Sequence, residues 1–187
     1  ASPFMQIPTP LLIKPESIEL LDCRLIPDSF QYLSFKSISP LAQALRDGII
    51  YGPGLVPVVA ACGLALEAQV RSNATSQAAF NYSIMEALLT LKAARPESHP
   101  MCYVLGHLNT IARRCAEGGL SPQETAERYR AFADELFTEI FTQDMQLSSE
   151  VNALINANAT VMVIGACGKL SSVGCGSILS GIIAAQQ

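Results

Sequence analysis

The sequence predicts a mainly α-helical chain with a small N-terminal β-hairpin, a helical bundle and a C-terminal unit of one strand and one helix. Apolar residues recur at helical spacing through the middle of the chain, β-branched runs stand near both ends, and Gly and Pro separate the segments. The 187 residues suit one domain, or one domain with part of another. We place the hairpin region at residues 1–38, the bundle domain at 39–147 and the C-terminal unit at 148–187.

The first region is predicted to form two strands between Ser17 and Ser37. An apolar run, Ile18–Leu21, and an aromatic run, Phe30–Phe35, lie on either side of the turn-forming Pro27-Asp28-Ser29. Alternation of apolar and polar residues in the second run is typical of a half-buried hairpin.

A helix is predicted to begin after Ser39, its N-cap, with Pro40 in the first turn. Its apolar residues form one stripe: Leu41, Ala44, Leu45 and Ile49. Tyr51-Gly52-Pro53-Gly54 then ends the helix. The next segment, Val58–Gln69, is apolar and rich in small residues, so we expect a helix buried over most of its surface.

Three longer helices are predicted to form the bundle, over Thr75–Arg95, over Met101–Glu117 and after Ser121. Gly118-Gly119 ends the second, and Ser121 with Glu124 forms a capping box for the third. Each has an apolar stripe: Phe80, Ile84, Leu88 and Leu91; Met101, Leu105, Leu108, Ile111 and Cys115; Tyr129, Phe132, Leu136 and Ile140.

The C-terminal unit has a different pattern. Thr160–Ile164 is a continuous apolar run that favours a buried parallel strand, Gly165–Gly168 follows as a turn, and Gly174-Cys175-Gly176 precedes a helix that ends at Ala185. This order predicts the first βα unit of a doubly wound, Rossmann-like domain. Such a strand needs neighbours that the sequence does not supply, so another domain or another chain would have to complete it.

Composition limits the partners. Half of the residues are apolar and 15% are charged, against roughly 25% in a typical soluble domain. The net charge of −4 argues against a nucleic-acid partner. A chain with so many apolar and so few charged residues implies that part of its surface is covered by another subunit. We expect a homodimer or a heteromer with a related chain.

We expect a cytoplasmic protein without a membrane span. Residues 1–15 lack the basic and apolar regions of a signal peptide. The apolar stretch Thr160–Ala185 has Lys169 near its middle and five glycines. The six cysteines include no C-x-x-C pair and only two histidines accompany them, so we expect reduced, buried thiols, no metal and no cofactor.

Three segments are candidates for binding a small molecule. Gly52 and Gly54 precede a helix, where amide groups bind phosphate, although a tight turn needs the same residues. Cys167, between Gly165 and Gly168, is placed to act as a nucleophile or acid near a helix start, or simply to fit a crowded turn.

Arg95 is the third candidate. It is placed to clamp a phosphate or to cap the last turn of its own helix, and His99 and Tyr51 complete the candidate pocket. Cys167, Tyr51 and His99 are therefore the candidate catalytic residues. The candidate substrate-binding residues are Gly52, Gly54, Arg95, Gly165 and Gly168.

In its order of segments the chain resembles the first half of the methylthioribose-1-phosphate isomerase family, whose relatives include the regulatory subunits of translation initiation factor 2B. The resemblance runs over nearly the whole chain, and its landmarks are Leu20–Pro27, Ala44–Ile50, Ala60–Leu66, Leu91–Pro96 and Gly168–Ala185. It implies a helical domain followed by a Rossmann-like domain, interconversion of an aldose phosphate and a ketose phosphate, and dimeric subunits.

The resemblance also implies lost chemistry. Tyr51 stands where the family has an arginine that contacts the substrate phosphate, and the family's Ala-Pro is here Pro53-Gly54. After Arg95-Pro96 the family's Thr-Ala-Val-Asn is replaced by Glu97-Ser98-His99-Pro100, which adds a negative charge.

The downstream glycines place Gly165 at the family's catalytic cysteine, and Cys167 two residues later. The family's catalytic aspartate belongs to its second half. One positioned acid or base contributes roughly 10²–10⁴ in rate. We therefore expect a degenerate, truncated relative that acts as a binding or oligomeric subunit. The alternatives are an enzyme with a changed reaction on a small metabolite, phosphorylated or not, and the N-terminal fragment of an active aldose-ketose sugar-phosphate isomerase.

Overall fold

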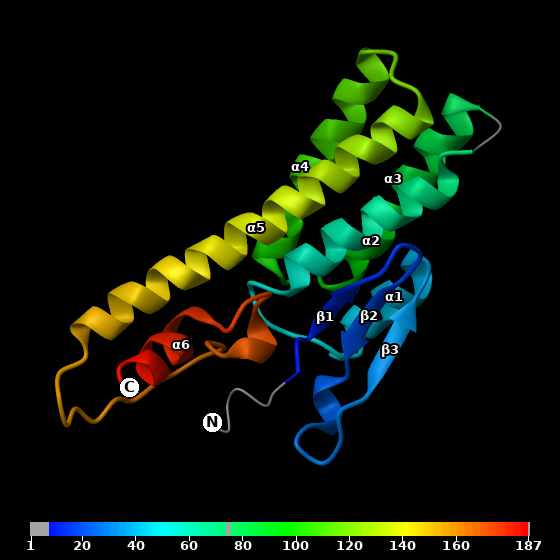
Figure 1. Ribbon diagram of the computed structural model, residues 1–187. Coiled ribbons are helices and arrows are strands. Elements are labelled where there is room, and N and C mark those ends of the chain that lie inside the picture. Colours follow the sequence, from blue (N-terminus) through cyan, green and yellow to red (C-terminus); the bar gives the residue numbers. More distant parts are fainter. Residues whose placement is uncertain (1–7, 74–75, 187) are drawn as a thin grey trace.

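The computed structural model describes residues 8–73 and 76–186 (Figure 1). A small sheet of strands β1 (Leu11–Ile13), β2 (Ile18–Leu21) and β3 (Tyr32–Phe35) packs beside helix α1 (Ile38–Arg46). The helical bundle follows, and its main core is continuous with the inner face of the sheet. The prediction of a mainly helical chain with a small N-terminal β region is confirmed.

The sheet is antiparallel in the order β1-β2-β3, and Leu20 faces Leu11 on one side and Leu33 on the other. The predicted pairing of Ile18–Leu21 with the following aromatic run is therefore confirmed. Strand β1 was not predicted, because a strand of three residues is too short to show alternation. Pairing with β2, a tertiary contact, holds β1 in place.

The bundle consists of α2 (Val56–Arg71), α3 (Gln77–Ala94), α4 (His99–Glu117) and α5 (Pro122–Leu154). Helix α2 is buried along nearly its whole length, as predicted from its small apolar residues. The predicted start of α1 is wrong by two residues: Ser37 is the N-cap and Ser39 lies inside the helix. Pro40 is compatible with that position, since the first turn of a helix needs no N–H donors.

Helix α5 is the longest element, with 33 residues, or about 50 Å at 1.5 Å per residue. The predicted capping box between Ser121 and Glu124 is confirmed. The first half of α5 packs in the bundle, and its second half extends past the other long helices (Figure 1). The division that we placed after residue 147 falls within this helix.

The C-terminal residues fold onto that second half of α5. Helix α6 (Ser177–Ala184) is confirmed near its predicted position and lies along α5 (Figure 1). A Cβ atom on Gly181 would come within 2.8 Å of Val151 and within 2.6 Å of the Ser148 carbonyl oxygen, so glycine allows the two helices to touch. A short 3-10 helix, Lys169–Ser171, precedes α6.

The predicted buried strand at Thr160–Ile164 is wrong. These residues form neither a strand nor a helix, and Met162 and Ile164 are 85% and 87% exposed. A strand needs a neighbouring strand to pair with its backbone groups. Within the described ranges no other segment pairs with Thr160–Ile164. The βα unit is therefore represented by its glycine turn and its helix. None of the described helices has both the length and the apolar character to cross a bilayer.

Candidate functional site

The predicted glycine loop packs against the C-terminal segment. The Gly54 amide donates to the Ser171 carbonyl oxygen at 3.2 Å, and Gly54 forms an isolated parallel bridge with Ser172. Gly52 has a φ of 110°, and a Cβ atom there would lie 2.5 Å from the Ser171 main chain. These glycines therefore permit a close contact between two backbones, and the Gly54 amide is already used in it.

Tyr51 lies at the edge of this contact and is 46% exposed. Its phenol makes no hydrogen bond with the described residues. A neutral hydroxyl in solvent binds a phosphate much more weakly than a bidentate guanidinium does. The residue is accessible to a ligand, but its own side chain supplies no charge for an anion.

The second glycine segment forms its own turn. Gly168 accepts hydrogen bonds through its carbonyl oxygen from the Ser171 amide at 3.0 Å and from the Ser171 hydroxyl at 2.7 Å. Cys167 is half-buried, and its thiol donates to the Gly165 carbonyl oxygen at 3.3 Å. Gly165 itself is exposed, with a φ of 120° and open space where a Cβ would be. No reactive side chain is thus presented at position 165.

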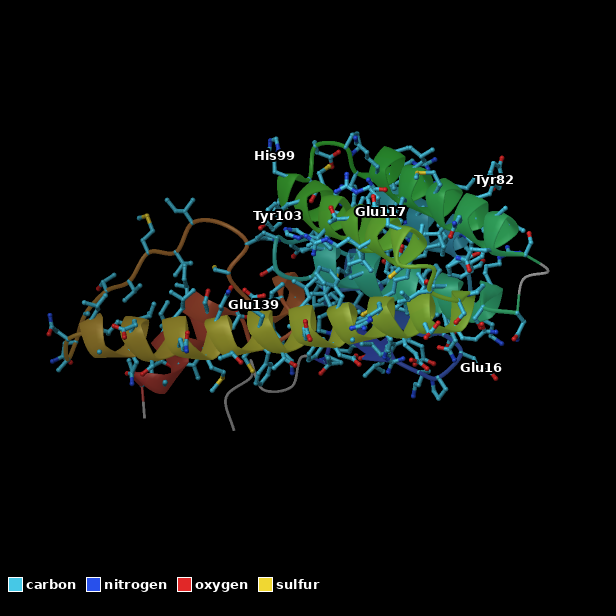
Figure 2. All side chains as sticks on the ribbon, turned by 90° about the horizontal axis from the view of Figure 1, so that it is seen from above. Glu16, Tyr82, His99, Tyr103, Glu117 and Glu139 are labelled. Atoms are coloured by element: carbon cyan, nitrogen blue, oxygen red, sulfur yellow. The ribbon has the colours of Figure 1, made fainter. Side chains whose placement is uncertain are left out.

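Arg95 is engaged by two partners. Its Nη1 donates to the Leu45 carbonyl oxygen at 3.3 Å, and its Nε forms a close ion pair with Glu97. The guanidinium therefore caps the last turn of α1, whereas the sequence suggested the last turn of its own helix. Arg95 also holds the pKa of Glu97 below its usual range through that hydrogen bond. His99 begins α4 and projects outward into solvent (Figure 2).

The structure thus brings Gly52, Gly54 and Gly168 together around Ser171, with Tyr51 and Cys167 as their chain neighbours, and leaves Arg95 and His99 outside this contact. Among the described residues, no hydrogen bond or ion pair joins the glycine loop to Cys167, Arg95 or His99. Five cavities along the described chain have none of the eight candidate residues in their lining.

Sequence reasoning missed Ser172. Its hydroxyl is buried without a hydrogen-bond partner among the described residues, and a Cβ on Gly54 would lie 2.7 Å from its Oγ. One carboxylate oxygen of Asp144, on α5, is also buried without a hydrogen-bond partner among the described residues, and it lies next to Gly174. Adjacent serines after a glycine turn were the available signal for Ser172, whereas nothing local marks Asp144.

All six cysteines are free thiols, as expected, but not all are buried: Cys62 and Cys115 are buried and Cys175 is exposed. Within residues 8–73 and 76–186, no group of three or more His, Cys, Asp or Glu side chains is close enough to hold a metal ion. The site as folded offers main-chain carbonyls, serine hydroxyls and small residues.

Comparison with known proteins identifies the class of protein. The chain is 30% identical over 182 residues to methylthioribose-1-phosphate isomerase of a Synechococcus species, and 26% identical over 180 residues to that of Albidiferax ferrireducens. These matches include 97% and 91% of this chain, and 50% and 47% of those proteins. No family model matches the chain.

Solved structures agree on the fold. A crystal structure of 5-methylthioribose 1-phosphate isomerase from Pyrococcus horikoshii superposes with a TM-score of 0.85 at 20% identity, over 97% of this chain and 50% of that one. Translation initiation factor eIF-2B subunit delta from A. fulgidus superposes with a TM-score of 0.80 at 18% identity, over 95% and 51%. The resemblance seen in the sequence is confirmed: the chain is a relative of the methylthioribose-1-phosphate isomerase family and spans about half the length of the curated relatives that it matches.

Proposed function

We propose that this chain acts by binding, as a non-catalytic subunit related to methylthioribose-1-phosphate isomerase. One observation carries the proposal. Gly165, aligned by the resemblance with the catalytic cysteine, presents only backbone, and the nearest sulfur, that of Cys167, bonds to the carbonyl of its own turn. Without a nucleophile or acid at that position, the family's reaction loses at least one group worth roughly 10²–10⁴ in rate.

The phosphate-binding groups support the same proposal. Tyr51 replaces the arginine of the family's loop, and the Gly54 amide is occupied by Ser171. Arg95 remains, but Glu97 neutralises it and the Leu45 carbonyl takes a second donor. A dianionic phosphate approaching this point would also meet the Glu97 carboxylate, which is a repulsive neighbour.

The surface supports a role in association. The second half of α5 and the residues that follow it leave several large apolar side chains exposed: Phe141, Met145, Leu147, Leu154, Val161, Met162, Ile164 and Ile178. We call this set the distal apolar surface. A monomeric protein rarely leaves so many apolar side chains exposed in one region, and covering them with a subunit removes the cost of hydrating them.

The first experiment measures mass in solution by light scattering, for the wild type and for a variant with Met162→Lys and Ile164→Lys. We expect an oligomer that dissociates in the double variant. The matched control places lysine at Tyr82 and Leu89, which are 65% and 61% exposed on α3, away from the distal apolar surface. A wild-type monomer that captures no related subunit would contradict the proposal.

The second experiment tests catalysis directly. Purified protein is incubated with methylthioribose 1-phosphate, and formation of the ketose phosphate is followed by NMR. We expect no conversion above the uncatalysed rate. Turnover that Cys167→Ala abolishes would instead support an enzyme, either a working isomerase or one with a remodelled site. The Cys115→Ala variant controls for general effects of removing a thiol.

A further inference from the structure

A cavity that the proposed function does not use lies between α3, α4 and the start of α5. Its volume is about 380 Å³, within the range of small-molecule sites, which is roughly 300–1,000 Å³. Figure 1 shows α3, α4 and the start of α5 at the same end of the bundle, far from the distal apolar surface. The glycine loop and the C-terminal turn do not contribute to it.

The floor of the cavity is apolar and buried. Phe80, Ile84 and Leu88 on α3 are 1%, 2% and 6% exposed, and Tyr129 on α5 is fully buried. Side chains three and four residues apart on α3 fall on one helix face, so they form a continuous apolar wall. The Tyr129 hydroxyl has no hydrogen-bond partner among the described residues, which is uncommon for a buried polar group in a complete core.

The rim mixes polar and apolar side chains and carries one positive charge, since Met85 and Ala116 are exposed there beside Asn81, Asn109 and Arg113. Asn81 and Asn109 stand on it as amides, and Arg113 on α4 is its charged member. Among residues 8–73 and 76–186, the ion-pair partner of the Arg113 guanidinium is the Glu117 carboxylate, at 3.8 Å, and the two side chains are 71% and 68% exposed. An ion pair that is this long and this exposed contributes little to stability. A ligand carboxylate can therefore replace the Glu117 carboxylate beside Arg113 at a small cost in free energy.

The other large cavities lack this combination. One beside α4 and α5, of about 400 Å³, is lined by Arg114, Arg128 and Glu135 and so has charges of both signs. Another, beside the second half of α5, is a shallow surface lined by polar and acidic side chains. An apolar interior with a single cationic group at the entrance is specific to the cavity between α3 and α4 among those described.

We propose that this cavity binds an apolar monocarboxylate, of the size of a medium-chain fatty acid. The hydrocarbon body lies on Phe80, Ile84 and Tyr129, where burial of apolar surface supplies the affinity. The carboxylate stays at the rim and accepts hydrogen bonds from the Arg113 guanidinium. This site is independent of the proposed loss of isomerase chemistry.

The test is isothermal titration calorimetry of the full chain with decanoate and, separately, with decan-1-ol. Saturable 1:1 binding of decanoate is expected, and the alcohol should bind up to about 5-fold more weakly because it lacks the charge. Arg113→Gln should weaken decanoate binding by about the same factor. The matched control is Arg114→Gln, which removes a charge from the next residue, on a different cavity, and should leave the affinity unchanged.

Two further variants separate the cavity from general adsorption. Ala112→Phe fills the space beside the floor, and Ala116→Trp covers the rim from an exposed position that does not perturb the core. Both should abolish binding. Absence of saturable binding, equal affinity for acid and alcohol, or retention of binding in both blocked variants would overturn the proposal. So would self-association through this face that the blocked variants prevent, since a second copy would then be the occupant.

Discussion

The side chain of Arg95 joins the end of α3 to the end of α1, because its Nη1 donates to the carbonyl oxygen of Leu45 at 3.3 Å. Leu45 lies one residue before the end of α1, and its carbonyl oxygen also accepts from the Gly48 amide at 3.3 Å. Arg95 therefore performs a structural task in addition to any contact with an anion.

Arg95→Ala should lower the free energy of unfolding by about 1 kcal/mol, since it removes a charged donor that is three-quarters buried. Urea denaturation measures the change. Glu97→Gln is the control, because its carboxylate is exposed and an exposed ion pair contributes little. Equal stability of the wild type and Arg95→Ala would show that the contact with Leu45 is not made in solution.

Gly52→Ala should destabilise the chain by at least about 1–3 kcal/mol, the cost of a left-handed conformation in a residue with a Cβ. The new Cβ would also lie 2.5 Å from the Ser171 main chain, so the C-terminal segment must move away. Hydrogen exchange of residues 168–184 should rise. Gly106→Ala is the matched control: it lies within α4 with open space around it and should stabilise by up to about 1 kcal/mol.

Asp22 should make the stability depend on pH. Its carboxylate accepts hydrogen bonds from the Arg24 guanidinium at 2.8 and 2.7 Å and from the Arg24 amide at 3.1 Å. The hydrogen bond from the Arg24 side chain is the main cause of the lowered pKa of Asp22. A lowered pKa in the folded state means that the stabilisation is fully present above the unfolded value, about 3.9. It is lost as the pH falls through the folded pKa.

The stability of Asp22→Asn should therefore fall below that of the wild type at pH 7, and the difference should shrink below about pH 4. Chemical denaturation at a series of pH values measures both. Asp28→Asn, at an exposed position of the same connection, is the control and should follow the wild type throughout. A difference that persists undiminished at pH 2 would rule out this role for the carboxylate.

The thiols should react in an order set by burial. Burial raises the pKa of Cys62 to about 12, so little thiolate is present at pH 8 and the residue should resist iodoacetamide in the folded protein. Cys175 is exposed and should be modified before Cys62. Mass spectrometry of peptides gives the order, and full modification of Cys62 is expected only in denaturant. Rapid labelling of Cys62 under native conditions would contradict the packing of α2.

Local signals in the sequence predicted the bundle well. The capping box at Ser121 and the apolar stripe of α3 depend on residues three and four positions apart, so the sequence alone contains them. The end of α4 at Gly118 followed from the same kind of reasoning. Sequence reasoning failed where a distant partner decides the structure, as for β1, which needs β2 to form.

The same distinction applies to the candidate site. The meeting of the glycine loop with Ser171 joins segments more than 100 residues apart, and the sequence predicted glycines in both without showing that they touch. The partner of Arg95 in α1 was likewise invisible, although the neighbouring Glu97 was visible as an added charge. The sequence shows which donors and acceptors a segment carries. Whether each of them already has a hydrogen-bond partner depends on how the whole chain folds.

The exposed run Thr160–Ile164 has a consequence for handling the protein. It is β-branched and apolar, contains no proline, and no charged residue occurs between Glu150 and Lys169. Such segments, when unprotected, pair edge to edge with identical copies and template fibrils. If a specific subunit does not cover this run, the protein should aggregate through it in concentrated solution. A single lysine within the run should reduce that aggregation.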